Sequence, residues 1–235
     1  MDDGGPNAPG AAWPPGWTVE HAAETGSTNA DLLATAAERP DRSVLFADHQ
    51  TAGKGRLDRR WDAPPGTNLL VSILFHEVPA QPSELTRRVA LAAVGASREV
   101  AGVDVRLKWP NDLLVGERKL AGILAERAAS GDVVVGLGLN VAWAPDGAAR
   151  LGDDLAPGDV LRALLVAYDR LPADVGDDYR AALGTLGRRV RVELPNGVVE
   201  GTATDVEADG RLVVLDACAV THRFSAGDVV HLRPR

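Results

Sequence analysis

Residues 107–126 place the strongest constraint on how this chain folds. They predict three short apolar strands joined by two turns, at 110–112 (Pro-Asn-Asp) and 116–118 (Gly-Glu-Arg), because proline fixes φ while Asn and Asp bond their own backbone. Gly122 lies inside the last strand, where a glycine often marks the close approach of a ligand or another backbone. Polar groups packed this densely around a buried hairpin are costly unless something binds them. The stretch therefore predicts a ligand site.

Lysine is used sparingly, and its placement supports this prediction. Of the 25 lysines and arginines, only Lys54, Lys108 and Lys119 are lysine. Lys108 and Lys119 flank the predicted hairpin, and Lys54 lies in a second glycine-rich stretch. Lysine supplies a compact, mobile ammonium where arginine supplies a planar fork. Ordinary solvated charges placed by chance are the competing interpretation, which is stronger for Lys108 than for Lys119.

The second glycine-rich stretch runs from Gln50 to Trp61 and alternates glycines with cations. Gly53 and Gly55 allow backbone N–H groups to face an anion, and Lys54 and Arg56 supply charge. The stretch is neither a Walker A loop nor a dinucleotide fingerprint, because Arg56 stands at the hydroxyl position and the spacing fails. It predicts a phosphate-binding loop of another kind, and a solvated basic loop is the alternative.

Two further polar groups interrupt apolar segments. Thr28 with Asp31 fits the capping-box spacing of a helix start, and a helix N-terminus is also a ready site for a polar ligand group. In a strand predicted at 132–142, Gly136 and Gly138 alternate with large apolar residues and leave one face bare, with room for a ligand. Asn140 ends this strip, where it either reads an adenine or ribose edge or simply starts a turn.

Composition narrows the class of protein. The net charge of −8 and the pI of about 5.1 argue against a nucleic-acid-binding surface, which needs a basic face. Cys218 is the single cysteine, and the five histidines show no metal-ligand spacing, so no dedicated metal site is expected. No apolar run reaches membrane-spanning length, and residues 1–16 lack the features of a signal peptide. We therefore expect a cytoplasmic protein with no membrane association.

The pattern along the chain predicts an α+β fold in two domains. Residues 1–16 are expected to form a disordered tail, 17–186 a domain with a central sheet and packed helices, and 187–235 a small antiparallel barrel, because short β patterns there alternate with turn signals. The first domain is expected to contain strands at 17–22, 43–48 and 68–75 and helices near 82–100, 159–171 (capped by Asp159) and 177–186. The barrel is expected to contain strands at 189–194, 198–206, 211–215 and 222–232.

Taken together, the motifs resemble the biotin–protein ligase family (biotin–[acetyl-CoA-carboxylase] ligases). The resemblance is carried by five segments in order: 27–29 (Ser-Thr-Asn), 50–61, 108–112 (Lys-Trp-Pro-Asn-Asp), 119–123 (Lys-Leu-Ala-Gly-Ile) and 136–140 (Gly-Leu-Gly-Leu-Asn). It implies a class II synthetase-like catalytic domain with a mixed or antiparallel sheet, followed by an SH3-like barrel. Nothing before Glu24 predicts a helix-turn-helix, so the resemblance is to members without the N-terminal DNA-binding domain.

The resemblance implies a two-step reaction with biotin and ATP as substrates and Mg²⁺ delivered with the ATP. Biotin and ATP would form biotinyl-5′-adenylate, and the biotin would then pass to one lysine of a biotin carboxyl carrier domain of a carboxylase. Attack of a carboxylate on an α-phosphate brings two anions together, so the reaction needs cations at the developing charge more than an acid or base. Lys119 and Arg56 fit that need, and Asp112 would hold a cation or later accept a proton from the carrier lysine.

The remaining roles implied by the resemblance fall into two groups. The biotin site would comprise Ser27, Thr28, Asn29, Gln50, Gly53, Lys54, Gly55, Arg56, Lys119 and Gly122. The nucleotide site would comprise Arg56, Arg59, Trp61, Asn111, Lys119 and Asn140. The family is compatible with a monomer or a homodimer.

The chain departs from the family loop at three positions. That loop usually reads Gly-Arg-Gly-Arg-x-Gly-Arg-x-Trp, whereas this chain has Lys54 at the first Arg, with Leu57 and Asp58 at the x-Gly pair. Asp58 removes a flexible glycine and adds a carboxylate beside the expected phosphate path. Three alternatives stay open: a lipoate or octanoate ligase of the same fold, a non-enzymatic biotin sensor, and a protein-interaction module led by the barrel.

Overall fold

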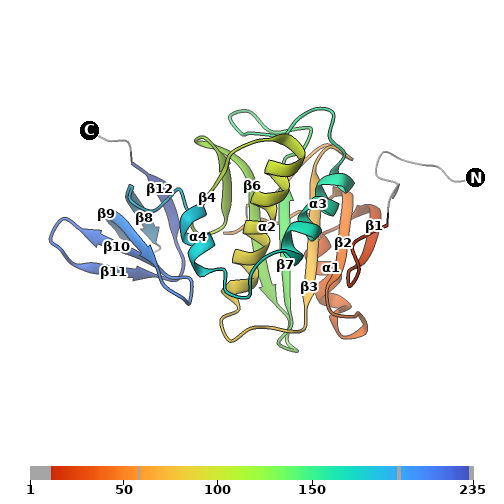
Figure 1. The fold of residues 1–235 in the computed structure, drawn as a ribbon, viewed down its shortest axis with the longest axis horizontal. Coiled ribbons are helices and arrows are strands. Elements are labelled where there is room, and N and C mark those ends of the chain that lie inside the picture. The colour runs from red at the N-terminus through yellow and green to blue at the C-terminus, as the bar shows by residue number, and fades with distance from the viewer. Residues whose placement is uncertain (1–11, 58, 195–196, 233–235) are drawn as a thin grey trace, which may run out of the picture.

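Two β-sheets, flanked by helices, organise the computed structural model, which describes residues 12–57, 59–194 and 197–232 (Figure 1). The larger sheet has seven strands in the order β1-β2-β3-β7-β6-β5-β4. Its β1 and β2 are parallel and its other neighbours antiparallel, which confirms the predicted mixed sheet. The strands are β1 (Thr18–Thr25), β2 (Ser43–Gln50), β3 (Leu69–Phe75), β4 (Val105–Lys108), β5 (Asp112–Val115), β6 (Arg118–Arg127) and β7 (Val133–Leu139).

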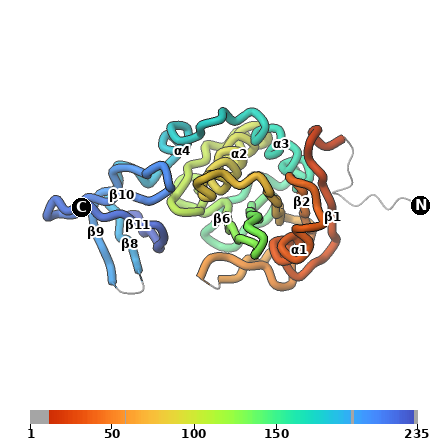
Figure 2. Tube along the Cα trace, turned by 90° about the horizontal axis from the view of Figure 1, so that it is seen from below, coloured from red at the N-terminus to blue at the C-terminus, as the bar shows by residue number. Residues whose placement is uncertain are grey.

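The two faces of this sheet differ, because successive side chains of a strand point to opposite faces. On β3, Val71 and Ile73 belong to the main apolar core with helices α2 (Ser83–Ala101) and α3 (Pro157–Asp169). Leu74 belongs to a separate cluster with helix α1 (Thr28–Ala34). Figure 2 accordingly shows α2 and α3 on one side of the molecule and α1 on the other. The face toward α1 is the one that carries Ser72, Gly136 and Gly138.

Small residues let α2 approach its neighbours closely, as its many alanines predicted. Ala92, Ala93 and Ala96 are fully buried. A methyl group on Gly95 would come 3.3 Å from the Cβ of Ala167 on α3. Gly102 ends α2 with a φ of 65°, a left-handed conformation that favours glycine.

Two helix starts differ from the predicted caps. Ser27, and not Thr28, is the N-cap of α1, and its side chain accepts from the Ala30 N–H. Asp31 instead accepts from the Thr25 hydroxyl. Helix α3 begins at Pro157 with Ala156 as its cap, so Asp159 lies in the first turn and is not the cap, because proline is well suited to a helix's first position. The short helix predicted near 177–186 is α4 (Gly176–Ala182).

The second sheet is antiparallel, with five strands in the order β11-β10-β9-β8-β12. The strands are β8 (Arg189–Leu194), β9 (Gly197–Val206), β10 (Leu212–Asp216), β11 (Thr221–Phe224) and β12 (Asp228–His231). The strand expected at 222–232 is therefore two strands. Within the described residues β11 and β12 are not paired, so the five strands of this SH3-like sheet form an open row and no closed barrel is detected. The predicted turn at Pro195 and Asn196 lies outside the described residues.

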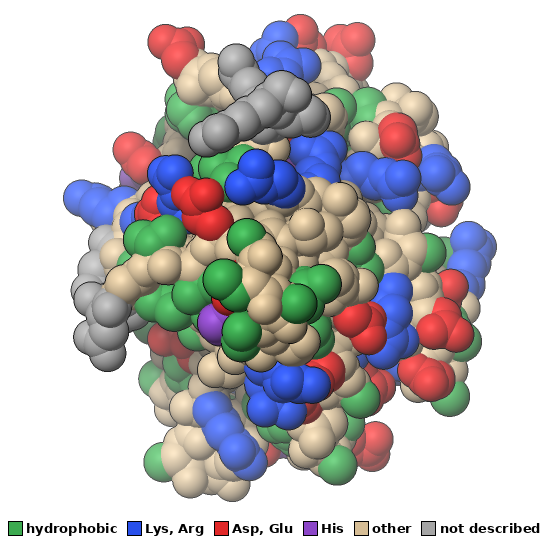
Figure 3. Space-filling view, turned by 90° about the vertical axis from the view of Figure 1, so that its left-hand side faces the viewer, with side chains coloured by type: hydrophobic (Ala, Val, Ile, Leu, Met, Phe, Trp, Pro, Cys, Tyr) green, Lys and Arg blue, Asp and Glu red, His purple; other side chains and the backbone are tan. Residues whose placement is uncertain are grey.

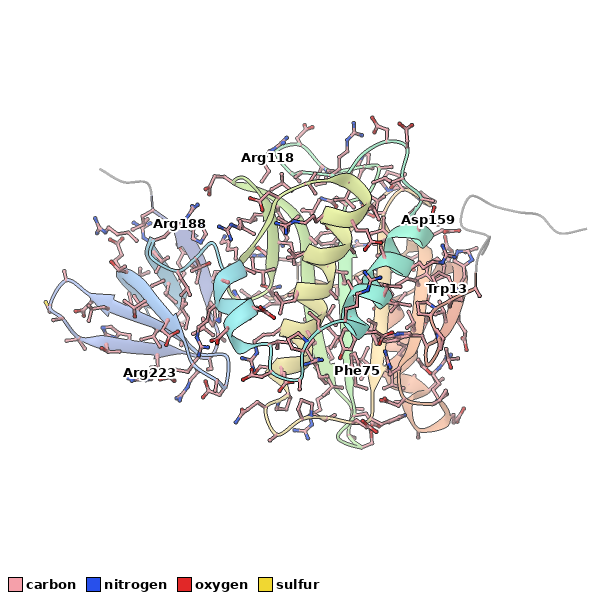
Figure 4. The ribbon with its side chains drawn as sticks, viewed as in Figure 1. Trp13, Phe75, Arg118, Asp159, Arg188 and Arg223 are labelled. Atoms are coloured by element: carbon pink, nitrogen blue, oxygen red, sulfur yellow. The ribbon has the colours of Figure 1, made fainter. Side chains whose placement is uncertain are left out.

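Side-chain hydrogen bonds join segments next to the second sheet to α2 and to the turns of the β4–β5–β6 hairpin. The Trp109 indole donates to the Gly210 carbonyl at 2.9 Å, and Arg87 donates to the Ala208 carbonyl at 2.9 Å. Arg188, labelled in Figure 4, donates to Glu117 at 2.7 Å, beside Arg118 in the turn between β5 and β6. Residues of the C-terminal part of the chain thus contact both turns of the β4–β5–β6 hairpin.

Two surface features bear on the expectations from sequence. Residues 1–11 of the expected tail lie outside the described residues, whereas Trp13 packs edge-on against Phe46 with ring centroids 5.9 Å apart. On the end of the molecule shown in Figure 3, lysines and arginines lie among acidic and apolar side chains and form no single basic surface. In the part of the chain that the structure describes, no helix is long and apolar enough to cross a membrane.

Candidate functional site

A cavity of about 540 Å³ lies on the α1 side of the large sheet. Its walls come from α1, the glycine-rich loop, β3, the β4–β5–β6 hairpin, β7 and β12 of the second sheet. Every site residue predicted from sequence lines it except Gly53: Ser27, Thr28, Asn29, Gln50, Lys54, Gly55, Arg56, Arg59, Trp61, Asn111, Asp112, Lys119, Gly122 and Asn140. Residues far apart in sequence are thus brought to one place.

One corner of the cavity is a buried polar network at the start of α1. Gln50 Oε1 accepts from the Thr28 backbone N–H at 2.8 Å and lies 3.1 Å from the Thr28 hydroxyl. That hydroxyl is 2.7 Å from the Ser72 hydroxyl, which lies 2.5 Å from Asn29 Oδ1. Asn29 Nδ2 donates to Leu124 O at 3.2 Å and to a Glu126 oxygen at 2.7 Å. This corner offers hydroxyl and amide groups in fixed positions to a polar ring.

The glycines of β7 make room for two side chains. A methyl group on Gly136 would come 2.3 Å from Asn29 Oδ1, and one on Gly138 would come 2.5 Å from the Trp61 ring. The bare strip predicted from the alternating glycines is therefore real, but Asn29 and Trp61 occupy part of it. The Trp61 indole N–H is buried and has no hydrogen-bond partner among the described residues.

The middle of the cavity carries the hairpin's charges. Lys119 Nζ lies 2.7 Å from Asp112 Oδ1 and 5.7 Å from the centre of the Trp61 ring. A methyl group on Gly122 would come 3.3 Å from both Lys119 Nζ and the Trp61 ring, so this glycine allows the lysine to lie across its strand. The ammonium is partly exposed and reaches the cavity, as the predicted anion site requires.

The glycine-rich loop folds back on itself through close backbone contacts. Lys54 and Arg60 form an isolated antiparallel bridge, and the Trp61 N–H donates to the Gly53 carbonyl at 3.1 Å. A methyl group on Gly53 would come 2.4 Å from the Trp61 carbonyl, which explains the glycine there. Leu57 is exposed and has a φ of 55°, a conformation that favours glycine. Asp58, the other departure from the family loop, lies outside the described residues.

Two loop arginines contact the second sheet. Arg56 Nη1 donates to Asn111 Oδ1 at 3.2 Å and to the Gly227 carbonyl at 3.4 Å. Arg59 forms an ion pair with Asp228, the first residue of β12. The sequence reasoning missed this wall of the cavity, because nothing local marks a contact between residues 169 positions apart.

Asn140 lines the cavity, but its side chain is bonded within the protein. Its Nδ2 donates to the Ala149 carbonyl at 2.9 Å, and its Oδ1 accepts from Asn68 at 3.3 Å. Asn68 Oδ1 in turn accepts from the Val141 N–H at 2.9 Å. These contacts support the alternative interpretation, in which Asn140 shapes the turn after its strand. Any ligand contact of the Asn140 side chain would use a remaining lone pair of Oδ1.

The described residues contain no group of three or more His, Cys, Asp and Glu side chains that would hold a metal ion. Asp112 is paired with the Lys119 ammonium, not gathered with other carboxylates. The site thus combines a polar corner with a cluster of cations in one cavity, which suits a neutral polar ring joined to an anionic group.

Comparison with known proteins agrees with this arrangement. Residues 23–140 match the model of the biotin/lipoate A/B protein ligase family, and 185–232 match the biotin protein ligase C-terminal domain. The chain is 42% identical to the biotin–[acetyl-CoA-carboxylase] ligase of Mycobacterium tuberculosis, over 93% of this chain and 91% of that protein. It is 39% identical to the Paracoccus denitrificans protein of the same name, over 54% of this chain and 56% of that protein.

A solved structure shares the fold across nearly the whole chain. The biotin protein ligase from Aquifex aeolicus in complex with biotin and ATP superposes with a TM-score of 0.78, covering 92% of this chain and 99% of that one, at 23% identity. The fold, the matched family model and the M. tuberculosis relative agree. The chain therefore belongs to the biotin/lipoate A/B protein ligase family.

Proposed function

We propose that this chain is an ATP-dependent biotin–protein ligase. It forms biotinyl-5′-AMP from biotin and ATP and then transfers biotin to a lysine of a biotin carboxyl carrier domain. One observation carries the proposal: a single cavity joins the Thr28–Gln50 corner to the Lys119 ammonium. Its volume of about 540 Å³ lies in the range of small-molecule sites. The name of the M. tuberculosis relative supports the same activity.

The polar corner is the site for the biotin ring. Thr28 Oγ1 accepts hydrogen bonds, and the Gln50 amide N–H₂ donates them, because Gln50 Oε1 already accepts from the Thr28 N–H. A cyclic urea presents both N–H donors and a carbonyl acceptor to such groups. The dithiolane ring of lipoate and the chain of octanoate present none of them, and burying these hydroxyls and amides against an apolar chain is costly. The corner therefore favours biotin over the other acids of this family.

Lys119 is the cation at the reacting centre. Its ammonium lines the same cavity as the polar corner, and we assign it contacts with both the biotin carboxylate and the α-phosphate. It lowers the repulsion between the two anions and stabilises charge that develops on the phosphoryl oxygens. Arg56 adds a second cation from the loop. This electrostatic work needs no general acid in the first step.

Asp112 has two roles in this scheme. It holds the Lys119 ammonium at 2.7 Å, and in the second step its carboxylate accepts a proton from the carrier lysine. Removing a proton from the lysine frees the amine for attack on the acyl carbon of the adenylate. Transfer from preformed biotinyl-AMP to a carrier domain tests this role directly. Asp112→Asn is expected to slow that transfer, and undiminished transfer would remove the proton-accepting role.

The loop between Gly53 and Trp61 covers the bound ligands. Lys54, Arg56 and Arg59 face the phosphates, and the unpaired Trp61 indole N–H supplies a donor to the adenylate. Mg²⁺ arrives with the ATP and keeps most of its waters. No carboxylate cage within the described residues holds it, so we derive no step that depends on a protein-bound metal.

The same proposal covers the wider setting of the protein. We assign catalysis to residues 17–186 and place the SH3-like sheet in 187–235, where β12 closes one wall of the cavity. We infer that the partner is a carrier domain of a biotin-dependent carboxylase and that the enzyme acts in the cytoplasm. Asn111 and Asn140 line the cavity, and we assign them to the nucleotide.

Transfer to a carrier domain is the experiment that tests the proposal. The chain is incubated with ATP, Mg²⁺ and a biotin carboxyl carrier domain, with biotin, lipoate or octanoate as the acid, and the carrier is weighed by intact-mass spectrometry. A mass increase with biotin alone, lost when the carrier lysine is changed to arginine, is expected. An increase with lipoate or octanoate but not with biotin would assign the chain to the other branch of the family.

A further inference from the structure

Ser72 is a polar residue in the middle of a buried apolar strand. Strand β3 reads Leu-Leu-Val-Ser-Ile-Leu-Phe, and all seven residues are buried. Ser72 is 1% exposed and lies on the face toward α1, where it lines the cavity. A buried hydroxyl lowers stability unless it is hydrogen-bonded, and any small apolar residue would pack at this position without that risk. The presence of a hydroxyl at position 72 is therefore explained by the hydrogen bonds that it makes with the groups around it.

The neighbours of Asn29 fix the direction of its hydrogen bonds. Its Nδ2 is close to Leu124 O and a Glu126 oxygen, both of which only accept, so the amide N–H₂ faces them. Its Oδ1 consequently faces Ser72 at 2.5 Å and accepts the Ser72 proton. Both ends of the Asn29 amide are used inside the protein. Asn29 is thus a supporting residue in this corner, and its side chain has no donor left for a ligand.

The hydrogen bond between Ser72 and Thr28 also has a fixed direction of donation. Because the Ser72 proton is given to Asn29, the 2.7 Å contact between the two hydroxyls has Thr28 donating to Ser72. The other acceptor near the Thr28 hydroxyl, Gln50 Oε1, is farther away at 3.1 Å. A hydroxyl has one proton and two lone pairs. Once its proton is given to Ser72, Thr28 Oγ1 offers only lone pairs to the cavity.

We propose that Ser72 is a positioning residue for ligand selection: the chain Glu126–Asn29–Ser72 orients the Thr28 hydroxyl as a hydrogen-bond acceptor, so the cavity selects an acid whose ring carries an N–H. This inference rests on the proposed function and extends it to Ser72 and Glu126, which were not among the predicted site residues. The Glu126 carboxylate starts the chain, since it accepts from Asn29 and so fixes the orientation of that amide. A cyclic urea satisfies the oriented acceptor, whereas an apolar acyl chain leaves it unpaired.

The test measures biotin binding by calorimetry in the absence of ATP. Ser72→Ala is expected to weaken biotin binding about five- to tenfold, the range for losing one oriented hydrogen bond, while ATP binding stays within twofold. Ser97→Ala is the matched control, because Ser97 is also fully buried but donates to the Ala93 carbonyl within α2. It should lose comparable thermal stability without a change in biotin affinity.

A double-mutant cycle separates positioning from a merely structural effect. Thr28→Val keeps the side-chain shape and removes the hydroxyl. If Ser72 acts through Thr28, adding Ser72→Ala to Thr28→Val should change biotin affinity by less than twofold. Fully additive losses would overturn the proposal, as would a Ser72→Ala protein that folds and binds biotin like the unmodified chain.

Glu126 provides a second route if Ser72→Ala does not fold. Glu126→Gln keeps an acceptor for Asn29 and should bind biotin within twofold of the unmodified chain, whereas Glu126→Ala should bind about threefold more weakly, because Asn29 keeps only its Leu124 contact. Equal affinity of these two variants would contradict the proposal. Failure of the unmodified chain to bind biotin at all would instead remove the proposed function, and this inference with it.

Discussion

Lys119 and Asp112 form an ion pair, with 2.7 Å between Nζ and Oδ1, across the paired strands β5 and β6. The bulge between Leu113 and Leu114 in this pairing lies next to that contact. Glycine at position 122 lets the lysine lie across its own strand toward Trp61. The ammonium is therefore held by one carboxylate on one side and left open to the cavity on the other.

Replacing Lys119 should strongly slow the first chemical step without unfolding the protein. Lys119→Gln is expected to slow biotinyl-AMP formation by about a hundredfold or more, in line with removal of one group that stabilises a transition-state charge. Single-turnover formation of the adenylate, followed by chromatography, measures this. Arg118→Gln is the control, because Arg118 is exposed one residue earlier and does not line the cavity. A Lys119→Gln enzyme within tenfold of normal would contradict the assigned role.

Replacing each of the two glycines of β7 with alanine should change the KM for a different substrate. Gly136→Ala would place a methyl group 2.3 Å from Asn29, and Gly138→Ala would place one 2.5 Å from the Trp61 ring. We expect Gly136→Ala to raise the KM for biotin about tenfold or more, and Gly138→Ala to raise mainly the KM for ATP while changing the Trp61 fluorescence. The KM values for both substrates, measured side by side, decide this. If both variants changed the two KM values equally, the cavity would not be divided into a biotin part near Gly136 and an ATP part near Gly138.

The Arg59–Asp228 ion pair should weaken ATP binding by the loop and contribute little to the stability of the fold. The pair is partly exposed, and such pairs contribute only about 0.2–1 kcal/mol. Asp228→Asn frees Arg59 and removes a negative charge from the cavity, so the KM for ATP should fall about two- to fivefold with little change in Tm. Asp205→Asn on β9, which loses a partly exposed pair with Arg180 of α4, is the control. A rise in the KM for ATP would show instead that the pair belongs to the nucleotide-bound state.

His76 and His231 should make the stability of the protein depend on pH in opposite directions. A hydrogen bond to Asp132 raises the pKa of His76 above its ordinary value of 6.5, so its stabilisation is full below about pH 6.5 and is lost as pH rises through the raised pKa. Burial lowers the pKa of His231 to about 4, so its neutral form is favoured and stability is lost as pH falls from 6.5 toward that value.

Thermal unfolding over this pH range checks both signs. His76→Gln should lower Tm more at pH 5.5 than at pH 8, values about one unit or more to either side of an ordinary histidine pKa. His231→Gln should do the reverse, its loss of Tm shrinking as the solution becomes more acidic. The Thr185 hydroxyl and Arg188, which contact the two ring nitrogens of His231, remain in place in that variant. Parallel pH profiles for the two variants would contradict this account.

The hairpin and the glycine-rich loop were predictable because their signals are local. Turn residues at 110–112 and 116–118 mark the strand ends, and the alternating glycines of 136–138 mark a face without side chains. The cap of α1 was assigned one residue late, because Ser27 and Thr28 are both good caps and spacing alone does not choose between them.

The contacts that complete the site depend on the fold and were not predictable. Asp228 and Gly227 reach the loop only because the second sheet packs beside the hairpin. Ser72 did carry a signal, since it is polar within an otherwise apolar strand, but its partners Thr28 and Asn29 lie on α1 and could not be named from sequence. The open second sheet was predicted as a barrel, because strand spacing does not show whether the first and last strands pair.

The measurement that tests the central claim most directly is the exchange of labelled pyrophosphate into ATP with biotin, lipoate or octanoate as the acid. The reverse of adenylation carries the label, so exchange reports the first step without any carrier protein. We predict exchange that depends on biotin, is absent with the other two acids and is lost in Lys119→Gln. Exchange with lipoate or octanoate alone, or tight biotin binding with no exchange under any condition, would contradict the assignment of this chain as a biotin ligase.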